Sequence, residues 1–128
     1  MKIFVTSVFV DDQEKALKFY TEVLGFIKKT DITAGNYRWL AVVSPEGHPD
    51  IELLLASNET SAAKMYQKAI HDAGIPAAIF KVSDIQREYE RLKARGVSFV
   101  MPPTKTGPST TAIFEDTCGN LISITQQP

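Results

Sequence analysis

The fold is decided by residues 10–26, which read VDDQEKALKFYTEVLGF. Apolar side chains recur there at the i, i+3, i+4, i+7, i+8 spacing of an amphipathic helix. They are Ala16, Phe19, Tyr20, Val23 and Leu24. Asp11 and Asp12 supply an N-cap, and Gly25 stands where a C-cap glycine belongs. Residues 3–10 (IFVTSVFV), just before, are β-branched or aromatic at nearly every position. A strand leading directly into a helix is therefore predicted.

Outward from this stretch, three strand-like runs follow, separated by Gly-, Asn- and Pro-containing turns. They are Phe26–Thr30, Tyr37–Ser44 and Ile51–Ser57. A helix with a possible cap at residues 58–61 comes next, closed by Gly74 and Pro76. Its expected apolar face is Ala62, Tyr66, Ala69, Ile70 and Ala73.

The same order of features then starts again. Ala77–Val82 is a predicted strand, and Ser83 with Gln86 has the spacing of a capping box. A second helical stripe ends at Gly96, and further strands are expected at 97–101, 110–114 and 121–126, with a Pro-rich loop after the first. We interpret the chain as a duplication within a single domain: module one at 1–57, a helical linker at 58–76 and module two at 77–128.

Composition narrows the function classes. The 128 residues carry a net charge of −1 without a basic stripe, so no nucleic-acid partner is expected. The N-terminal apolar run is too short to span a membrane and lacks a small-residue cleavage site. The single cysteine, Cys118, has no partner for an internal disulfide, which fits a reducing compartment. We expect a cytoplasmic protein without a membrane partner.

Two motifs carry a family resemblance. Residues 10–26 resemble the first-module signature of the vicinal oxygen chelate superfamily, which contains glyoxalase I, extradiol dioxygenases and bleomycin-resistance proteins. Residues 114–122 resemble its Asp-Pro-x-Gly-Asn turn and last strand, with Thr117 in place of the usual proline. The resemblance implies an α+β fold of two βαβββ modules that form a curved mixed sheet with a concave cavity. It also implies a homodimer.

In metal-using members, the first and last strand of each module supply the metal ligands. The matching positions here are Val5, Glu52, Ala77 and Ser123, of which only Glu52 binds a divalent cation strongly. His48 and His71 are interpreted as ordinary surface histidines. We therefore predict no tightly bound metal and no cofactor.

Glu52 is the candidate catalytic residue. Strand alternation places it on one face with Leu54, opposite Ile51, Leu53 and Leu55. It could bind a ligand or act as a metal-free general base. The alternative is a relic carboxylate satisfied by solvent or by Arg38 on the adjacent strand.

The rest of the cavity wall is expected to be mostly apolar and aromatic, as in small-molecule sites. The alternation does not tell whether Trp39 and Phe114 face the cavity or the core. The candidate ligand-binding residues are Val5, Ser7, Phe9, Arg38, Trp39, Leu54, Ala77, Ile79, Phe114 and Ser123.

These residues favour a metal-independent protein that binds a small molecule around Glu52 over a metal-dependent lyase or dioxygenase. Two other functions stay open. One is a glyoxalase- or dioxygenase-like enzyme, or an isomerase with Glu52 as its general base. The other is a vestigial groove in a protein that acts through self-association.

Overall fold

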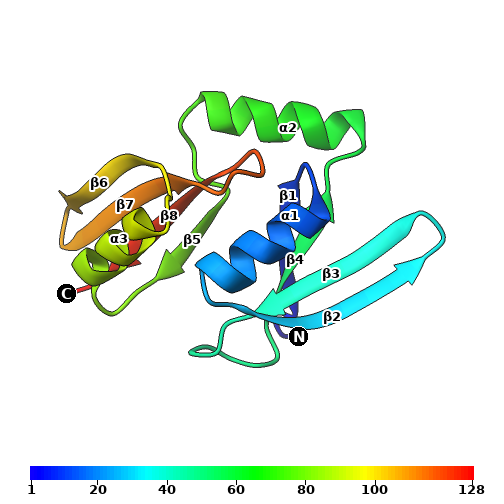
Figure 1. The fold of residues 1–128 in the computed structure, drawn as a ribbon, viewed down its shortest axis with the longest axis horizontal. Helices are drawn as coiled ribbons and strands as arrows, with labels where there is room; N and C mark the ends of the chain where they lie inside the picture. Colours follow the sequence, from blue (N-terminus) through cyan, green and yellow to red (C-terminus); the bar gives the residue numbers. More distant parts are fainter. The chain divides into compact units, whose positions relative to one another are not determined.

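The computed structural model describes residues 1–128 and divides them into two compact units, Met1–Met65 and Tyr66–Pro128 (Figure 1). Each unit has a four-stranded sheet, with strand order β1-β4-β3-β2 in the first and β5-β8-β7-β6 in the second. In both, the first strand runs parallel to the last and the other pairs are antiparallel. The predicted α+β fold of two βαβββ modules is confirmed.

The first unit contains β1 (Val5–Val10), α1 (Gln13–Lys18), a π-helical turn (Phe19–Val23), β2 (Ile27–Ala34), β3 (Tyr37–Val43) and β4 (Glu52–Ser57). The predicted helix start is confirmed, because the backbone N–H of Lys15 donates to the Asp12 carboxylate at 3.1 Å. Gly25 ends the helical segment with φ +90°, a conformation that glycine adopts without steric cost. The segment is not α-helical throughout, since its second half widens to a π-helix.

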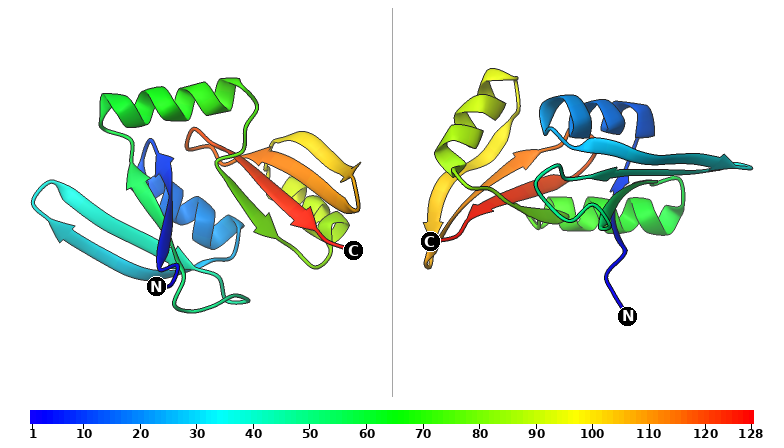
Figure 2. Two further views of the ribbon diagram at one scale, coloured as in Figure 1. Left: turned by 180° about the vertical axis from the view of Figure 1, so that it is seen from behind. Right: turned by 90° about the horizontal axis from the view of Figure 1, so that it is seen from below.

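One face of the first sheet packs under α1. Seen from behind, the sheet lies in front of that helix (Figure 2). The amide of Gln13 on α1 donates to the backbone carbonyls of Arg38 at 3.0 Å and Leu55 at 2.9 Å, which fixes the helix on β3 and β4. The buried apolar residues beneath it are Val8, Val10, Leu40, Val42, Leu53 and Leu55. The opposite face of this sheet carries Glu52.

Strand β2 contains a β-bulge. Lys28 is paired with Val42, but the next pair along the ladder is Thr30 with Ala41, so Lys29 is an extra residue. An extra residue reverses the face to which every later side chain of the strand points. The strand also continues to Ala34, four residues beyond the predicted end at Thr30.

The second unit contains β5 (Ala78–Lys81), α3 (Ile85–Ala94), β6 (Phe99–Thr106), β7 (Ser109–Glu115) and β8 (Leu121–Gln126). The capping box predicted for Ser83 is wrong. Asp84 is the N-cap, and its carboxylate accepts from the N–H of Arg87 at 3.1 Å. The loop predicted after residue 101 is largely strand, because β6 is an edge strand and prolines are tolerated where no inner ladder bond is needed.

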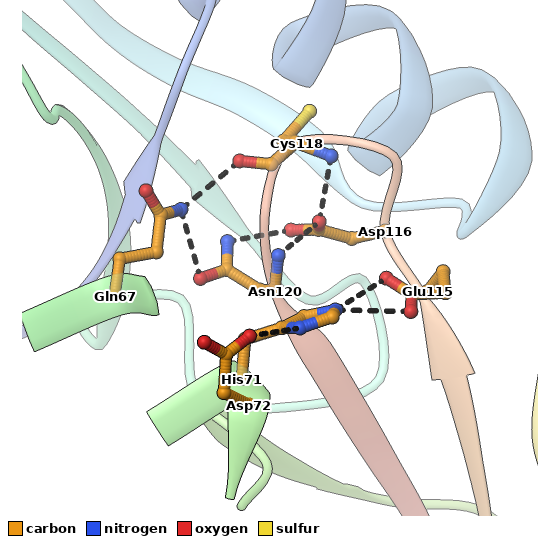
Figure 3. Close-up of polar contacts among 7 residues, drawn as sticks. All are labelled: Gln67, His71, Asp72, Glu115, Asp116, Cys118 and Asn120. Atoms are coloured by element: carbon orange, nitrogen blue, oxygen red, sulfur yellow. Dashed lines mark hydrogen bonds and ion pairs between the residues drawn. The ribbon is translucent and has the colours of Figure 1, made fainter. Parts of the chain in front are cut away.

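Helix α2 (Ser61–Asp72) joins the units, and its residue pattern is inverted relative to the prediction. Tyr66 on the predicted buried face is 57% exposed, whereas Gln67 is 7% exposed. The Gln67 amide donates to the carbonyl of Cys118 at 3.0 Å and to Oδ1 of Asn120 at 3.1 Å (Figure 3). The hydrogen bonds of this buried amide offset the cost of removing it from water. The buried residues of the helix are therefore Ala63 and Gln67, while the predicted Ala62, Ala69 and Ala73 are exposed.

None of the three α-helices or the π-helical turn has both the length and the apolar character required to cross a bilayer.

Candidate functional site

Glu52 is the first residue of β4, and only 6% of it is exposed. Its strand neighbour on β1 is Val5, directly opposite in the parallel ladder. Leu54 and Ala56 follow on the same face of β4, as the period of two requires. A carboxylate therefore lies beside apolar side chains on this face of the sheet.

Apolar side chains form a small cluster on the same face, beside Glu52 and farther along β4. Ala41, Leu54 and Ala56 are buried, and Val5, Phe9 and Trp39 pack against them half-exposed. Trp39 is thus on the face of Glu52 and not under the helix, which the alternation alone did not decide. Ser7 shares the face through its pairing with Leu54 and is exposed.

Thr30 completes the polar part of the site. Its hydroxyl donates to Oε1 of Glu52 at 3.1 Å, from the far side of β3. No fully buried side-chain oxygen of the chain lacks a hydrogen-bond partner, and Oε2 of Glu52 has none, so Oε2 is not completely enclosed by protein atoms. Thr30 was not among the predicted site residues. The bulge that places it here leaves no recognisable signal in the sequence.

Glu52 does not pair with Arg38, which was one of the alternatives that the sequence left open. Arg38 lies on the helix-covered face, where its guanidinium binds Asp31 at 2.9 Å and Glu14 of α1 at 2.6 Å. Hydrogen bonds from Arg38 lower the pKa of the Asp31 carboxyl, and the charges of Arg38 and Lys28 lower it further. The same hydrogen bonds with Asp31, and then those with Glu14, raise the pKa of Arg38. Arg38 therefore does not line the face of Glu52.

In the second unit, Ser123 on β8 is 3% exposed and is paired with Ile79 of β5. Ala77 lies two residues before Ile79 and shares its face. The pairing register therefore differs between the units. Ser123 is paired with the residue two positions after Ala77, whereas Glu52 is paired with Val5 itself. Phe114 is on the other face. It is fully buried, stacks edge-on against Phe99 at 5.4 Å and is a core residue rather than a lining residue.

The four positions that match family metal ligands were tested against the donor atoms present. Val5 and Ala77 have no donor atom in their side chains, and the Ser123 hydroxyl is a weak ligand. Nowhere in the chain do three His, Cys, Asp or Glu side chains gather in a group that could hold a metal ion. These residues do not fit a divalent cation.

The other buried polar residues stabilise the fold. The Asp116 carboxylate accepts from the backbone N–H groups of Cys118 at 2.8 Å and Asn120 at 2.9 Å, which closes the turn before β8 (Figure 3). His71 is half-buried rather than a surface residue, because its Nε2 lies 3.0 Å from both oxygens of Glu115. His48 is exposed, as predicted.

Comparisons with known proteins agree with this architecture. The family model described as "Glyoxalase/Bleomycin resistance protein/Dioxygenase superfamily" matches residues 2–124. The uncharacterized protein YurT of Bacillus subtilis (strain 168) is 58% identical over 99% of this chain and 100% of its own length.

Solved structures are similar over almost the whole chain. UcmS2 has a TM-score of 0.84 and 32% identity, covering 98% of this chain and 97% of that one. TnmS3, an antibiotic binding protein from Streptomyces sp. CB03234, has a TM-score of 0.80 and 28% identity, covering 100% and 97%. With the two βαβββ units, these matches show that the chain belongs to the glyoxalase/bleomycin resistance protein/dioxygenase superfamily.

Proposed function

We propose that this protein binds a small organic molecule, without a metal ion, on the sheet face around Glu52. One observation carries the proposal: a nearly buried carboxylate, with one oxygen that has no hydrogen-bond partner, lies on a sheet face that also carries apolar and aromatic side chains. Small-molecule sites combine an apolar lining with a few polar groups of fixed orientation. Ser7 on β1 shares this face and is proposed as a further lining residue, and Ala77, Ile79 and Ser123 are proposed to line the sheet face of the second unit that carries Ser123.

The family supports ligand binding. One structural neighbour of 28% identity is an antibiotic binding protein, and its fold covers this chain completely. Members of one fold family differ in function through the residues of the site, so the neighbour supports the class of ligand, a drug-like organic molecule, and not its identity.

The experiment is a ligand screen by thermal shift on protein treated with EDTA. A ligand that binds the folded state raises the melting temperature by mass action. We expect hits whose shift is the same with EDTA and with added Zn²⁺ or Ni²⁺, and is lost in Glu52→Gln. Hits that appear only with a metal would contradict metal independence. Turnover of a hit that depends on Glu52 would identify an enzyme instead.

The homodimer and the cytoplasmic location remain predictions. Light scattering on the purified chain measures the first. If no screened ligand binds and Trp39→Ala changes the oligomeric state, self-association replaces ligand binding as the proposed function.

A further inference from the structure

We propose that the ligand of the Glu52 face carries a positively charged nitrogen, which Oε2 of Glu52 binds directly while Thr30 holds the carboxylate in position. The inference rests on the proposed function and adds the chemical class of the ligand. In this proposal Thr30 is a positioning residue, which acts through the Glu52 carboxylate.

Glu52 has no cationic partner. Its side chain accepts from a neutral hydroxyl, and no lysine, arginine or histidine forms an ion pair with it. The one arginine on a neighbouring strand, Arg38, is bound to Asp31 and Glu14 on the other face. A carboxylate that is 6% exposed and lacks a countercharge is unfavourable, and a cation from outside relieves that cost.

The bulge in β2 determines which side chain stands next to Glu52. In a regular ladder that continued from the pair Lys28 and Val42, Lys29 would stand opposite Ala41 and point to the face of Glu52. The extra residue puts Thr30 there instead. The ammonium group of Lys29 donates a hydrogen bond to the backbone carbonyl of Pro49 in the loop before β4. The bulge therefore gives Glu52 a neutral neighbour in place of a lysine.

The neighbours of Glu52 on its face are apolar. Val5 and Leu54 flank it, while Phe9 and Trp39 pack farther along β4, beside Ala56. Apolar surroundings lower the local dielectric and strengthen an ion pair, and the aromatic rings lie where the apolar body of a ligand would extend. A divalent metal needs several oxygen or nitrogen donors, which these side chains do not offer. An organic ammonium or amidinium with an apolar body matches the face better.

The test compares two probes of nearly equal shape, phenethylammonium chloride and 2-phenylethanol, at neutral pH. Trp39 is the only tryptophan, so its fluorescence reports binding at this face. We expect the ammonium to bind roughly ten- to hundredfold more tightly than the alcohol, as charge-assisted hydrogen bonds do. Glu52→Gln should remove the difference, and Thr30→Val should reduce it several-fold. Asp50→Asn, which removes an exposed carboxylate two residues away, is the matched control and should change nothing.

Equal affinity for the two probes, or a preference for the ammonium that survives in Glu52→Gln, would overturn the cation proposal and leave the proposed function standing. Binding of neither probe would also overturn it. If the thermal-shift screen then still yields neutral ligands lost in Glu52→Gln, ligand binding at this face holds without a cation. If that screen is empty too, the proposed function itself fails. Circular dichroism melting of each variant confirms that it is folded.

Discussion

Thr30 on β2 and Glu52 on β4 are joined by a hydrogen bond of 3.1 Å that passes over β3. Ala41 on the intervening strand is the pairing partner of Thr30, and its side chain is short enough to leave the path open. The bond orients a carboxylate on a face where no cation does so. Function at this face is therefore expected to cost stability in the unliganded protein.

Glu52→Gln should raise the free energy of unfolding of the unliganded protein by about 0.5–2 kcal/mol, because it removes a buried charge and keeps an acceptor for Thr30. Urea unfolding at neutral pH measures this. The matched variant Thr30→Val should lower stability by about 1–3 kcal/mol, since it leaves Oε1 without its donor. A loss of stability in Glu52→Gln would mean that the carboxylate serves the fold.

In the turn before β8, Gly119 lies so close to the side chain of Gln67 that adding a single methyl group tests this contact. Gly119 has φ +100°, and a Cβ added there would lie 2.6 Å from Nε2 of Gln67. Gly107 also has a positive φ, +65°, but a Cβ there would meet nothing within 4 Å. Both substitutions by alanine carry the strain of a left-handed conformation, of about 1–2 kcal/mol. Gly119→Ala should cost measurably more, because Gln67 must move and give up its hydrogen bonds. Equal losses in a thermal melt would mean that Gln67 moves aside freely.

Thr117 is the one residue other than glycine with a positive φ, at 63°. The superfamily turn usually has proline at this place, but a proline ring holds φ near −65°. Thr117→Gly should therefore stabilise the protein by about 1 kcal/mol. Thr117→Pro should destabilise it strongly, since the turn would have to change conformation. If the proline variant melted at the same temperature as the parent, the turn would have to be free to adopt both geometries.

Asp31 makes the free energy of unfolding depend on pH. Its pKa in the folded protein is below the ordinary value of 3.8, because Arg38 donates hydrogen bonds to the carboxylate. A carboxyl group whose pKa is lower in the folded than in the unfolded protein stabilises the fold at pH values above its unfolded-state pKa. This stabilisation disappears as the pH falls through the pKa of the folded state. Asp31→Asn should thus be less stable than the parent at neutral pH and equally stable well below pH 3.8. Unfolding curves at several pH values give the comparison; a difference that persists in acid would point to another cause.

The sequence by itself determined the local elements and the family. Asp12 and Gly25 bound a helical segment because capping and a left-handed glycine depend on a few neighbouring residues. The motif register identifies Glu52, and strand alternation places it on one face with Leu54. Such features need no knowledge of what packs against them.

Only the tertiary structure decided which partners these residues have. The bulge at Lys29 moves Thr30 to Glu52 and turns Asp31 toward Arg38, and no local propensity announces it. The docking of α2 through Gln67 likewise reverses the face that its apolar pattern predicts. The physical reason is that the register between strands decides to which face of the sheet a side chain points. In the same way, the hydrogen bonds that a helix forms decide which of its faces is buried. Both are set by residues distant in the chain.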